Sequence, residues 1–190
     1  MTTETRTARD AAASRAPGYP AHLVRSVTLP GGATVVIRPI TPEDVTLEQE
    51  FVRELSSESR YFRFMQALRE LSPQMLSHFT RIDYDRHMAF LAVVPAGDRE
   101  REIGVGRYVA APDGTSCEFA VVVADAWHGK GVGSALMDAL MDAARGRGFQ
   151  RMFGDVLANN HKMRTLMRHM GFRIAAHADD ARLVRVEADL

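Results

Sequence analysis

A glycine-rich turn between an apolar β-branched run and an amphipathic helix constrains the fold of this chain more than any other feature. Residues 121–123 are three valines, residues 129–133 read Gly-Lys-Gly-Val-Gly, and apolar residues then recur at helical spacing up to residue 143. The first N–H groups of a helix carry partial positive charge, and glycines let an anion approach the backbone closely. We therefore expect a phosphate or pyrophosphate site here, to which the side chains of His128 and Lys130 add donors.

The spacing of the glycines separates the kinds of phosphate site. A P-loop requires G-x-x-x-x-G-K-[ST], and no Lys-Ser or Lys-Thr pair follows Gly133. A dinucleotide site requires G-x-G-x-x-G, but the glycines here fall at every second residue. Asp155 still lies about where a ribose-binding acid would, so this alternative stays open. A turn that merely connects a strand to a helix is the other alternative.

Strand and helix patterns alternate along the chain, which predicts an α/β fold. Strands are predicted at residues 34–38, 88–94, 102–110, 116–123, 151–157 and 183–186. Helix starts are predicted at Thr41 and Ser72, because each is followed by a proline at the first helical position. Further helices are predicted at residues 56–64, 132–145 and 160–170.

Length and composition indicate one domain that does not need disulfide bonds to fold. We expect residues 1–26 to form a flexible tail and residues 27–190 the domain. Acidic and basic residues balance at 24 each, which argues against a nucleic-acid partner. Cys117 is the single cysteine, expected as a small buried residue, and the seven scattered histidines predict no metal site. No signal peptide or run of ~20 apolar residues is present, so we expect a cytoplasmic protein that does not enter membranes.

Two segments resemble the cofactor motifs of the GNAT superfamily of N-acetyltransferases. His128-Gly129-Lys130-Gly131-Val132-Gly133 is similar to the pyrophosphate loop [Q/R]-x-x-G-x-[G/A], with His128 in the place of Gln or Arg. Asn160-His161-Lys162-Met163, followed by Gly171-Phe172, is similar to the second motif, N-x-x-[A/M] running to G-F. Residues 57–64, 82–90 and 118–121 also resemble the acetyltransferase domain of Pat-type bacterial protein lysine acetyltransferases. Together the resemblance spans roughly residues 35–186.

The resemblance implies a GNAT fold, in which a mixed sheet of six or seven strands carries helices on both faces. It also implies an N-acetyltransferase that moves the acetyl group of acetyl-CoA to an amine, either a protein lysine or a small molecule. A catalytically silent acyl-CoA-binding sensor or partner module is the alternative, and a monomer or a homodimer is expected. The residues expected to bind the cofactor are Val121, Val122, Val123, His128, Gly129, Lys130, Gly131, Val132, Gly133, Ser134, Asn160 and Met163.

The chemistry of acetyl transfer requires a neutral amine. An ordinary lysine titrates near 10.4, so neutralising it at pH 7 costs roughly 4.6 kcal/mol, and a general base removes the proton. Glu118 matches the catalytic Glu of Pat-type enzymes, and we expect its apolar neighbourhood, residues 119–123, to strengthen it as a base. A solvent-facing Glu at the start of an edge strand is the alternative.

The acid that protonates the leaving thiolate is not evident from the sequence. Many GNAT enzymes have a Tyr seven residues after the motif Asn, where this chain has Met167. The remaining candidates are Tyr61, Tyr84 and Tyr108, provided that the fold brings one of them to the site. A separate polar set could line the acceptor site or form salt bridges, and it consists of Arg60, Arg63, Asp83, Asp85 and His87.

Overall fold

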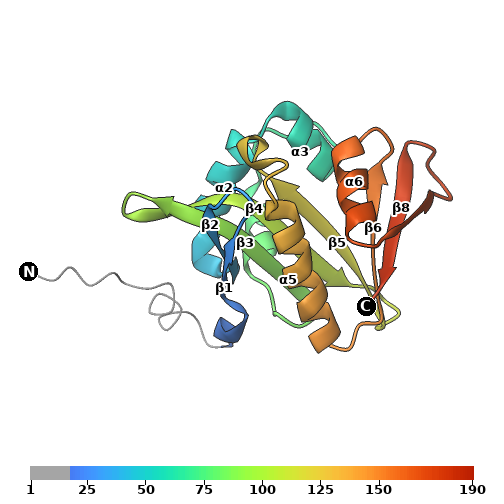
Figure 1. The fold of residues 1–190 in the computed structure, drawn as a ribbon, viewed down its shortest axis with the longest axis horizontal. Coiled ribbons are helices and arrows are strands. Elements are labelled where there is room, and N and C mark those ends of the chain that lie inside the picture. The colour runs from blue at the N-terminus through green and yellow to red at the C-terminus, as the bar shows by residue number, and fades with distance from the viewer. Residues whose placement is uncertain (1–17) are drawn as a thin grey trace, which may run out of the picture.

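One mixed sheet runs through the computed structural model, which describes residues 18–190 (Figure 1). Its eight strands lie in the order β1-β2-β3-β4-β5-β6-β8-β7, and β5 and β6 are the parallel neighbours. The strands are β1 (Arg25–Thr28), β2 (Thr34–Pro39), β3 (His87–Ala96), β4 (Arg99–Ala110), β5 (Ser116–Val123), β6 (Arg151–Leu157), β7 (Arg173–Ala176) and β8 (Leu183–Asp189).

The sheet has more strands than the six or seven that the sequence predicted. β1 and β7 are the additional strands, and each has four residues, of which two are exposed in β1 and three in β7. Such short strands form through their pairing with β2 and β8 and leave no long apolar run in the sequence. β1 begins at Arg25, before the predicted domain start at residue 27. Residues 1–17 of the predicted tail lie outside the described residues.

The helices begin at the capping residues from which their starts were predicted. Thr41 caps a short 3₁₀ helix, η2 (Pro42–Asp44), which leads into α2 (Val45–Glu54). The Ser56 and Ser72 side chains accept N–H bonds at the starts of α3 (Ser57–Phe64) and α4 (Pro73–Thr80). The other elements are η1 (Ala21–Leu23), η3 (Asp125–Trp127), α5 (Val132–Gly146) and α6 (His161–His169).

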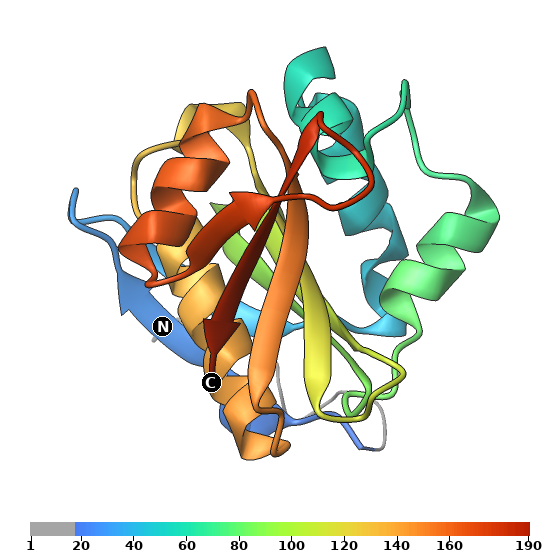
Figure 2. The same ribbon diagram turned by 90° about the vertical axis from the view of Figure 1, so that its right-hand side faces the viewer.

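The helices cover the two faces of the sheet separately (Figure 2). α5 packs on one face, where Leu136 and Leu140 are fully buried. α2, α3 and α4 lie over the other face, where a second apolar cluster includes Phe51 and Leu91. Because α3 lies beside the end of β5 and α5 begins just after it, the two layers meet at the glycine-rich turn.

β5 and β6 separate after three paired residues. Their parallel register ends at Glu118 and Phe153, although β5 continues to Val123 and β6 to Leu157. The ring and carbonyl of Phe119 lie against Gly154, where an added Cβ would meet them at 3.0 and 3.1 Å. The two strands are therefore still close at Phe119 and Gly154, and the slot opens beyond this contact, toward Val121.

Within residues 18–190, no helix has the length and apolar character that crossing a membrane requires.

Candidate active site

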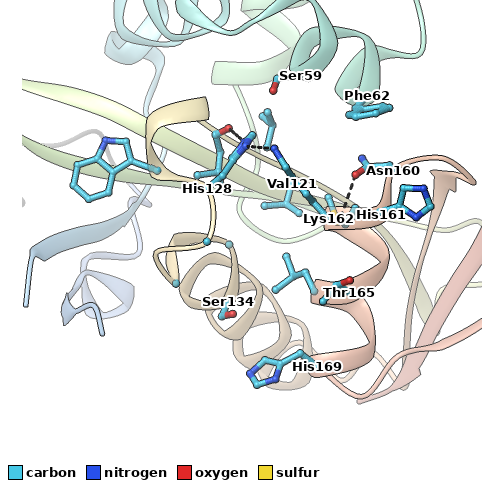
Figure 3. Close-up of a pocket in the computed structure, with 18 of the residues that line it drawn as sticks. Ser59, Phe62, Val121, His128, Ser134, Asn160, His161, Lys162, Thr165 and His169 are labelled. Carbon is cyan, nitrogen blue, oxygen red and sulfur yellow. Dashed lines mark hydrogen bonds between the residues drawn. The ribbon is translucent and has the colours of Figure 1, made fainter. Parts of the chain in front are cut away.

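A pocket of about 900 Å³ lies at the open end of the slot. Ser59 and Phe62 of α3 stand on one side of it and Ser134 of α5 on the other, while Val121 and His128 lie between them (Figure 3). The lining residues are Pro30, Glu58, Ser59, Phe62, Arg63, Val121, Val122, Val123, Trp127, His128, Gly129, Gly131, Gly133, Ser134, Asn160, His161, Lys162, Met163, Thr165, Leu166 and His169.

The backbone of β5 presents alternate residues to the slot. The N–H of Ala124 donates to Ile103 in β4, and the carbonyl of Ser116 accepts from Ala111 on the same side. N–H and C=O groups alternate in direction along a strand, so even-numbered residues of β5 face β4 and odd-numbered residues face β6. Val121 thus directs its N–H and C=O into the slot, beyond the last β6 partner. The backbone of Val122 pairs with β4 instead, although Val122, like Val121 and Val123, is among the pocket-lining residues.

The glycine-rich turn adopts backbone conformations that side chains resist. Gly129 and Gly131 have φ of +72° and +94°, and Gly131 is the N-cap of α5. A Cβ on Gly131 would lie 3.0 Å from Pro30, and one on Gly133 would lie 3.0 Å from Leu166 of α6. The glycines therefore let the turn approach its neighbours and direct the first N–H groups of α5 toward the pocket.

The imidazole of His128 connects β5 with α6 beside the slot. Its Nε2 lies 2.9 Å from the carbonyl oxygen of Val123, so Nε2 carries the proton and donates. Nδ1 is then an acceptor, and the ammonium of Lys162 on α6 donates to it across 3.2 Å. Figure 3 shows His128 and Lys162 together at the pocket. These two bonds fix the turn to β5 and hold a lysine amine at the pocket.

Two residues of the predicted cofactor set lie outside the pocket lining. Val132 is fully buried in the core under α5, so its side chain cannot contact a ligand. The Lys130 amine lies 5.3 Å from the ring centre of Trp127, and neither the amine nor the rest of the side chain is among the lining groups. Turn geometry explains both, because adjacent residues in a tight turn point in different directions.

Asn160 begins α6 and also lines the pocket. Its side-chain oxygen accepts the N–H of Met163 across 3.1 Å, which makes it the N-cap of α6. The residue is 8% exposed and lines the pocket, so its amide NH₂ remains as a donor toward a ligand. Met163 lies beside it in the lining.

Glu118 lies at the closed end of the slot, in the last residue pair between β5 and β6. The side chain is exposed and is not part of the pocket lining, so the apolar residues 119–123 do not enclose it as expected. It shares a face of the sheet with Val122, since both are even-numbered residues of β5, whereas Phe119 and Val121 pack on the α5 side. The lining contains another carboxylate, that of Glu58 on α3, which is also exposed.

Of the polar residues considered for the acceptor site, one lines the pocket and four do not. Arg63 lines the pocket, whereas Arg60 donates to the carbonyl of Leu55. Asp83 accepts the N–H groups of Asp85 and His87, and these hydrogen bonds keep its pKa low although burial raises it. Asp85 pairs with Arg147. Asp83, Asp85 and His87 therefore shape a loop at the start of β3, away from the pocket.

None of the tyrosines in residues 18–190 lines the pocket, and Met167 does not either. Met167 is fully buried in the core, so the position that often has Tyr in this superfamily points inward here. Tyr84 donates to the carbonyl of Ile40, and Tyr108 is fully buried. Tyr61 is 43% exposed on α3.

A buried group of charges supports the sheet below α3. The Arg107 guanidinium contacts Glu48 across 3.3 Å and stacks on Phe79 at 4.2 Å. Burial and the neighbouring Glu48 carboxylate raise the pKa of Glu102 well above its usual range. Burial also lowers the pKa of Arg63, to about 10, with Arg107 adding to the effect.

Several lining residues are not among those predicted from the sequence. Ser59, Phe62 and Glu58 are on α3, and Lys162, Thr165 and His169 are on the outward face of α6. Their positions depend on how the two helices pack at the end of β5, which no local pattern encodes. Within residues 18–190, no group of three or more His, Cys, Asp or Glu side chains is arranged to hold a metal ion.

Comparisons with known proteins agree with this geometry. Residues 49–172 match the model of the Acetyltransferase (GNAT) family. Acetyltransferase PA5475 of Pseudomonas aeruginosa is 39% identical over 173 residues, which cover 89% of this chain and 92% of that protein. Acetyltransferase Pat of Mycolicibacterium smegmatis is 35% identical over 141 residues, 74% of this chain but 41% of that longer protein.

Solved structures give the same result. The GNAT domain of S. lividans PAT is 32% identical with a TM-score of 0.83, covering 90% of this chain and 99% of that one. The cAMP-binding acyltransferase from Mycobacterium smegmatis is 29% identical with a TM-score of 0.60, and the match covers 89% of this chain and 48% of that one. The chain thus spans less than half of these mycobacterial relatives.

Proposed function

The chain belongs to the GNAT acetyltransferase family and is an acyl-CoA-dependent transferase, and we propose that it transfers the acetyl group of acetyl-CoA to a primary amine. The slot between β5 and β6 carries this proposal. Val121 directs backbone groups into it, and it leads to the N-terminus of α5 at the glycine turn. A long molecule with an amide-bearing arm and a pyrophosphate fits such a path.

The parts of acetyl-CoA have separate partners in this arrangement. The first N–H groups of α5, next to Ser134, bind the pyrophosphate. The backbone of Val121 and the NH₂ of Asn160 bond to the pantetheine arm, which runs along β5 as an added strand would. The N–H of Val121 or Val123 then lies where it can donate to the thioester carbonyl as negative charge develops on it.

The amine approaches from the face of the sheet that carries Glu118. Glu118 lies three residues from Val121 along β5, about 10 Å at ~3.3 Å per residue, which a side chain and one water can bridge. It removes the proton, and the amine attacks the thioester carbonyl. A thiol with a pKa near 8.5 leaves without an obligatory acid, which is consistent with the buried position of Met167.

Protein lysine is the acceptor that we propose first. The support is the similarity to Acetyltransferase Pat and to the GNAT domain of S. lividans PAT. The acceptor face is also open, because Glu118 and Glu58 are both exposed. Two carboxylates beside an open face attract the ammonium of a lysine side chain. A small-molecule amine fits the same chemistry and is the alternative acceptor.

The test combines binding with product analysis. Calorimetric titration measures acetyl-CoA affinity, and thiol release is followed with lysine-bearing peptides and small amines, whose acetylation is confirmed by mass spectrometry. Lys130 and Lys162 are the only lysines of the chain, so acetylation of the protein itself is easily separated by intact mass. Transfer to an amine supports the proposal. Tight acetyl-CoA binding without transfer to any amine would favour a silent acyl-CoA-binding module.

A further inference from the structure

Asp125 connects the two sides of the pocket. Its carboxylate accepts the N–H of Ser56 across 2.9 Å, the hydroxyl of Ser56 across 2.7 Å and the hydroxyl of Ser59 across 2.8 Å. Asp125 itself begins η3, the segment between β5 and the glycine turn. One side chain thus joins the segment that leads to the cofactor turn to the start of α3, 66 and 69 residues away in the sequence.

Each end of this connection contributes to the pocket. Three residues after Asp125, His128 begins the turn and bonds to Val123 at the slot. At the other end, α3 supplies Ser59, Phe62 and Arg63 to the opposite wall. The face of α3 that Asp125 fixes is therefore the face that an acceptor meets as it approaches the thioester.

The contact consists of hydrogen bonds from neutral serine groups to one carboxylate. Partial burial raises the pKa of Asp125, but the hydrogen bonds from Ser56 and Ser59 outweigh this effect and lower it. The carboxylate is therefore charged at neutral pH, and hydrogen bonds to a charged acceptor are stronger than neutral ones. The Ser56 hydroxyl also accepts the N–H of Ser59, so the same network caps α3.

α3 depends on such contacts for its position. It has eight residues, and helices shorter than ~12 residues are marginal on their own. Tyr61 on its outward side and Met65 just after its end are 43% and 41% exposed, and Phe64 packs against the second apolar cluster. The hydrogen bonds of Asp125 connect the segment before the turn directly to the start of this helix.

We propose that Asp125 is a positioning residue that couples acetyl-CoA binding at the turn to the placement of α3 at the acceptor site. The inference rests on the proposed function, because it takes the turn as the acetyl-CoA site. Binding of acetyl-CoA orders residues 128–134. The hydrogen bonds of Asp125 to Ser56 and Ser59 then also restrict the start of α3. The acceptor wall is thereby completed when the co-substrate is present.

Hydrogen exchange measured by mass spectrometry tests the coupling with acetyl-CoA as the only probe. In the wild type, saturating acetyl-CoA should slow exchange in the turn and, by roughly tenfold, in residues 56–64. In Asp125→Asn, which keeps the shape but loses the charge, the turn should still be protected while α3 changes less than about twofold. The matched control is Asp138→Asn, an exposed carboxylate on α5, which should behave as the wild type.

The outcomes separate the two proposals. If acetyl-CoA protects the turn but α3 is unaffected in the wild type, or is protected equally in Asp125→Asn, the coupling is wrong and the acetyl-CoA site stands. If acetyl-CoA protects neither region, the proposed function fails and the coupling fails with it. Ser59→Ala provides a second variant, and circular dichroism establishes that each variant is folded.

Kinetics with an accepted amine provide the readout that a purely structural role would not move. Asp125→Asn should raise the KM for the amine about tenfold, within the usual range of site-to-site coupling, while acetyl-CoA affinity stays within about twofold. If Asp125 acts through Ser59, the double variant with Ser59→Ala should be no worse than the worse single variant. Fully additive losses, or a loss confined to acetyl-CoA affinity, would overturn the assignment.

Discussion

The Nε2 of His128 donates to the carbonyl oxygen of Val123 across 2.9 Å, so the first residue of the glycine turn is bonded to the last residue of β5. Its Nδ1 accepts from Lys162 at the same time. The side chain thus acts as both a donor and an acceptor and connects β5 with α6. A glutamine, which also has a donor and an acceptor at its end, can make the same two contacts.

The first prediction concerns this bridge. His128→Gln should keep acetyl-CoA affinity within about threefold, whereas His128→Ala should lower it about tenfold through loss of both hydrogen bonds. Calorimetric titration of the two variants measures this. Equal losses in both variants would show that the imidazole ring itself, rather than its hydrogen bonds, is what the site requires.

The second prediction places a charge at the start of α5. Ser134 lines the pocket within the first turn of the helix, where the helix dipole stabilises an acidic residue. Ser134→Asp should therefore leave thermal stability unchanged or slightly raised. It should weaken acetyl-CoA binding by roughly 10- to 100-fold, because a carboxylate would face the pyrophosphate.

Ser134→Asn is the matched control, since it has nearly the same size without the charge. It should bind acetyl-CoA within a few-fold of the wild type. If the Asp and Asn variants bind equally well, the pyrophosphate does not lie at this helix start.

The third prediction concerns the pH dependence of stability. Glu102 is 2% exposed, and burial together with Glu48 raises its pKa well above the ordinary 4.5. The unfolded chain releases this proton near pH 4.5, whereas the folded chain retains it to higher pH. The folded state therefore binds more protons above that value, and this contribution to stability is lost as the pH rises toward the folded pKa.

Replacement of the carboxyl group by an amide removes this dependence. Glu102→Gln should become more stable relative to the wild type as the pH is raised from 5 to 9, as measured by urea denaturation. Glu50→Gln, an exposed site on α2, should follow the wild type at every pH. Parallel curves for Glu102→Gln and the wild type would show that Glu102 ionises normally in the folded protein.

The sequence predicted the parts of the fold that local chemistry encodes. Thr41, Ser56 and Asn160 each combine a capping side chain with a following helical pattern, and all three begin helices. The glycines predicted the turn because glycine readily adopts the positive φ values that Gly129 and Gly131 have in the structure. β7 was missed because its four residues form a strand only against β8.

The site was predictable where one turn supplies it and not where distant elements meet. Gly131 and Ser134 follow from the motif, and both line the pocket. The sequence leaves two roles open for Arg63 and does not assign Lys162 to the site, because each belongs to a helix whose position depends on packing far from the turn. The burial of Met167 and the exposure of Glu118 were not predictable for the same reason, since both depend on which face a neighbouring layer covers.

The last prediction assigns the general base. Glu118→Gln should lower turnover by ~10²–10⁴-fold, the usual contribution of general-base catalysis. Acetyl-CoA affinity should barely change, because Glu118 lies outside the pocket lining and Gln preserves its shape. The rate of the wild type should rise with pH as the amine loses its proton. In the variant, the amine must lose its proton without help from Glu118, so activity should recover in part at high pH.

Glu58→Gln is the decisive comparison, because Glu58 is the carboxylate among the pocket-lining residues and is exposed like Glu118. Both variants are assayed by thiol release from pH 6 to 10 with the same amine. The assignment predicts that Glu58→Gln keeps the wild-type pH profile and changes at most the KM for the amine, through a weaker attraction of its positive charge. If Glu58→Gln instead loses the pH-dependent rate while Glu118→Gln retains it, the base lies on α3. The amine would then be deprotonated from the helix wall and not from the closed end of the slot.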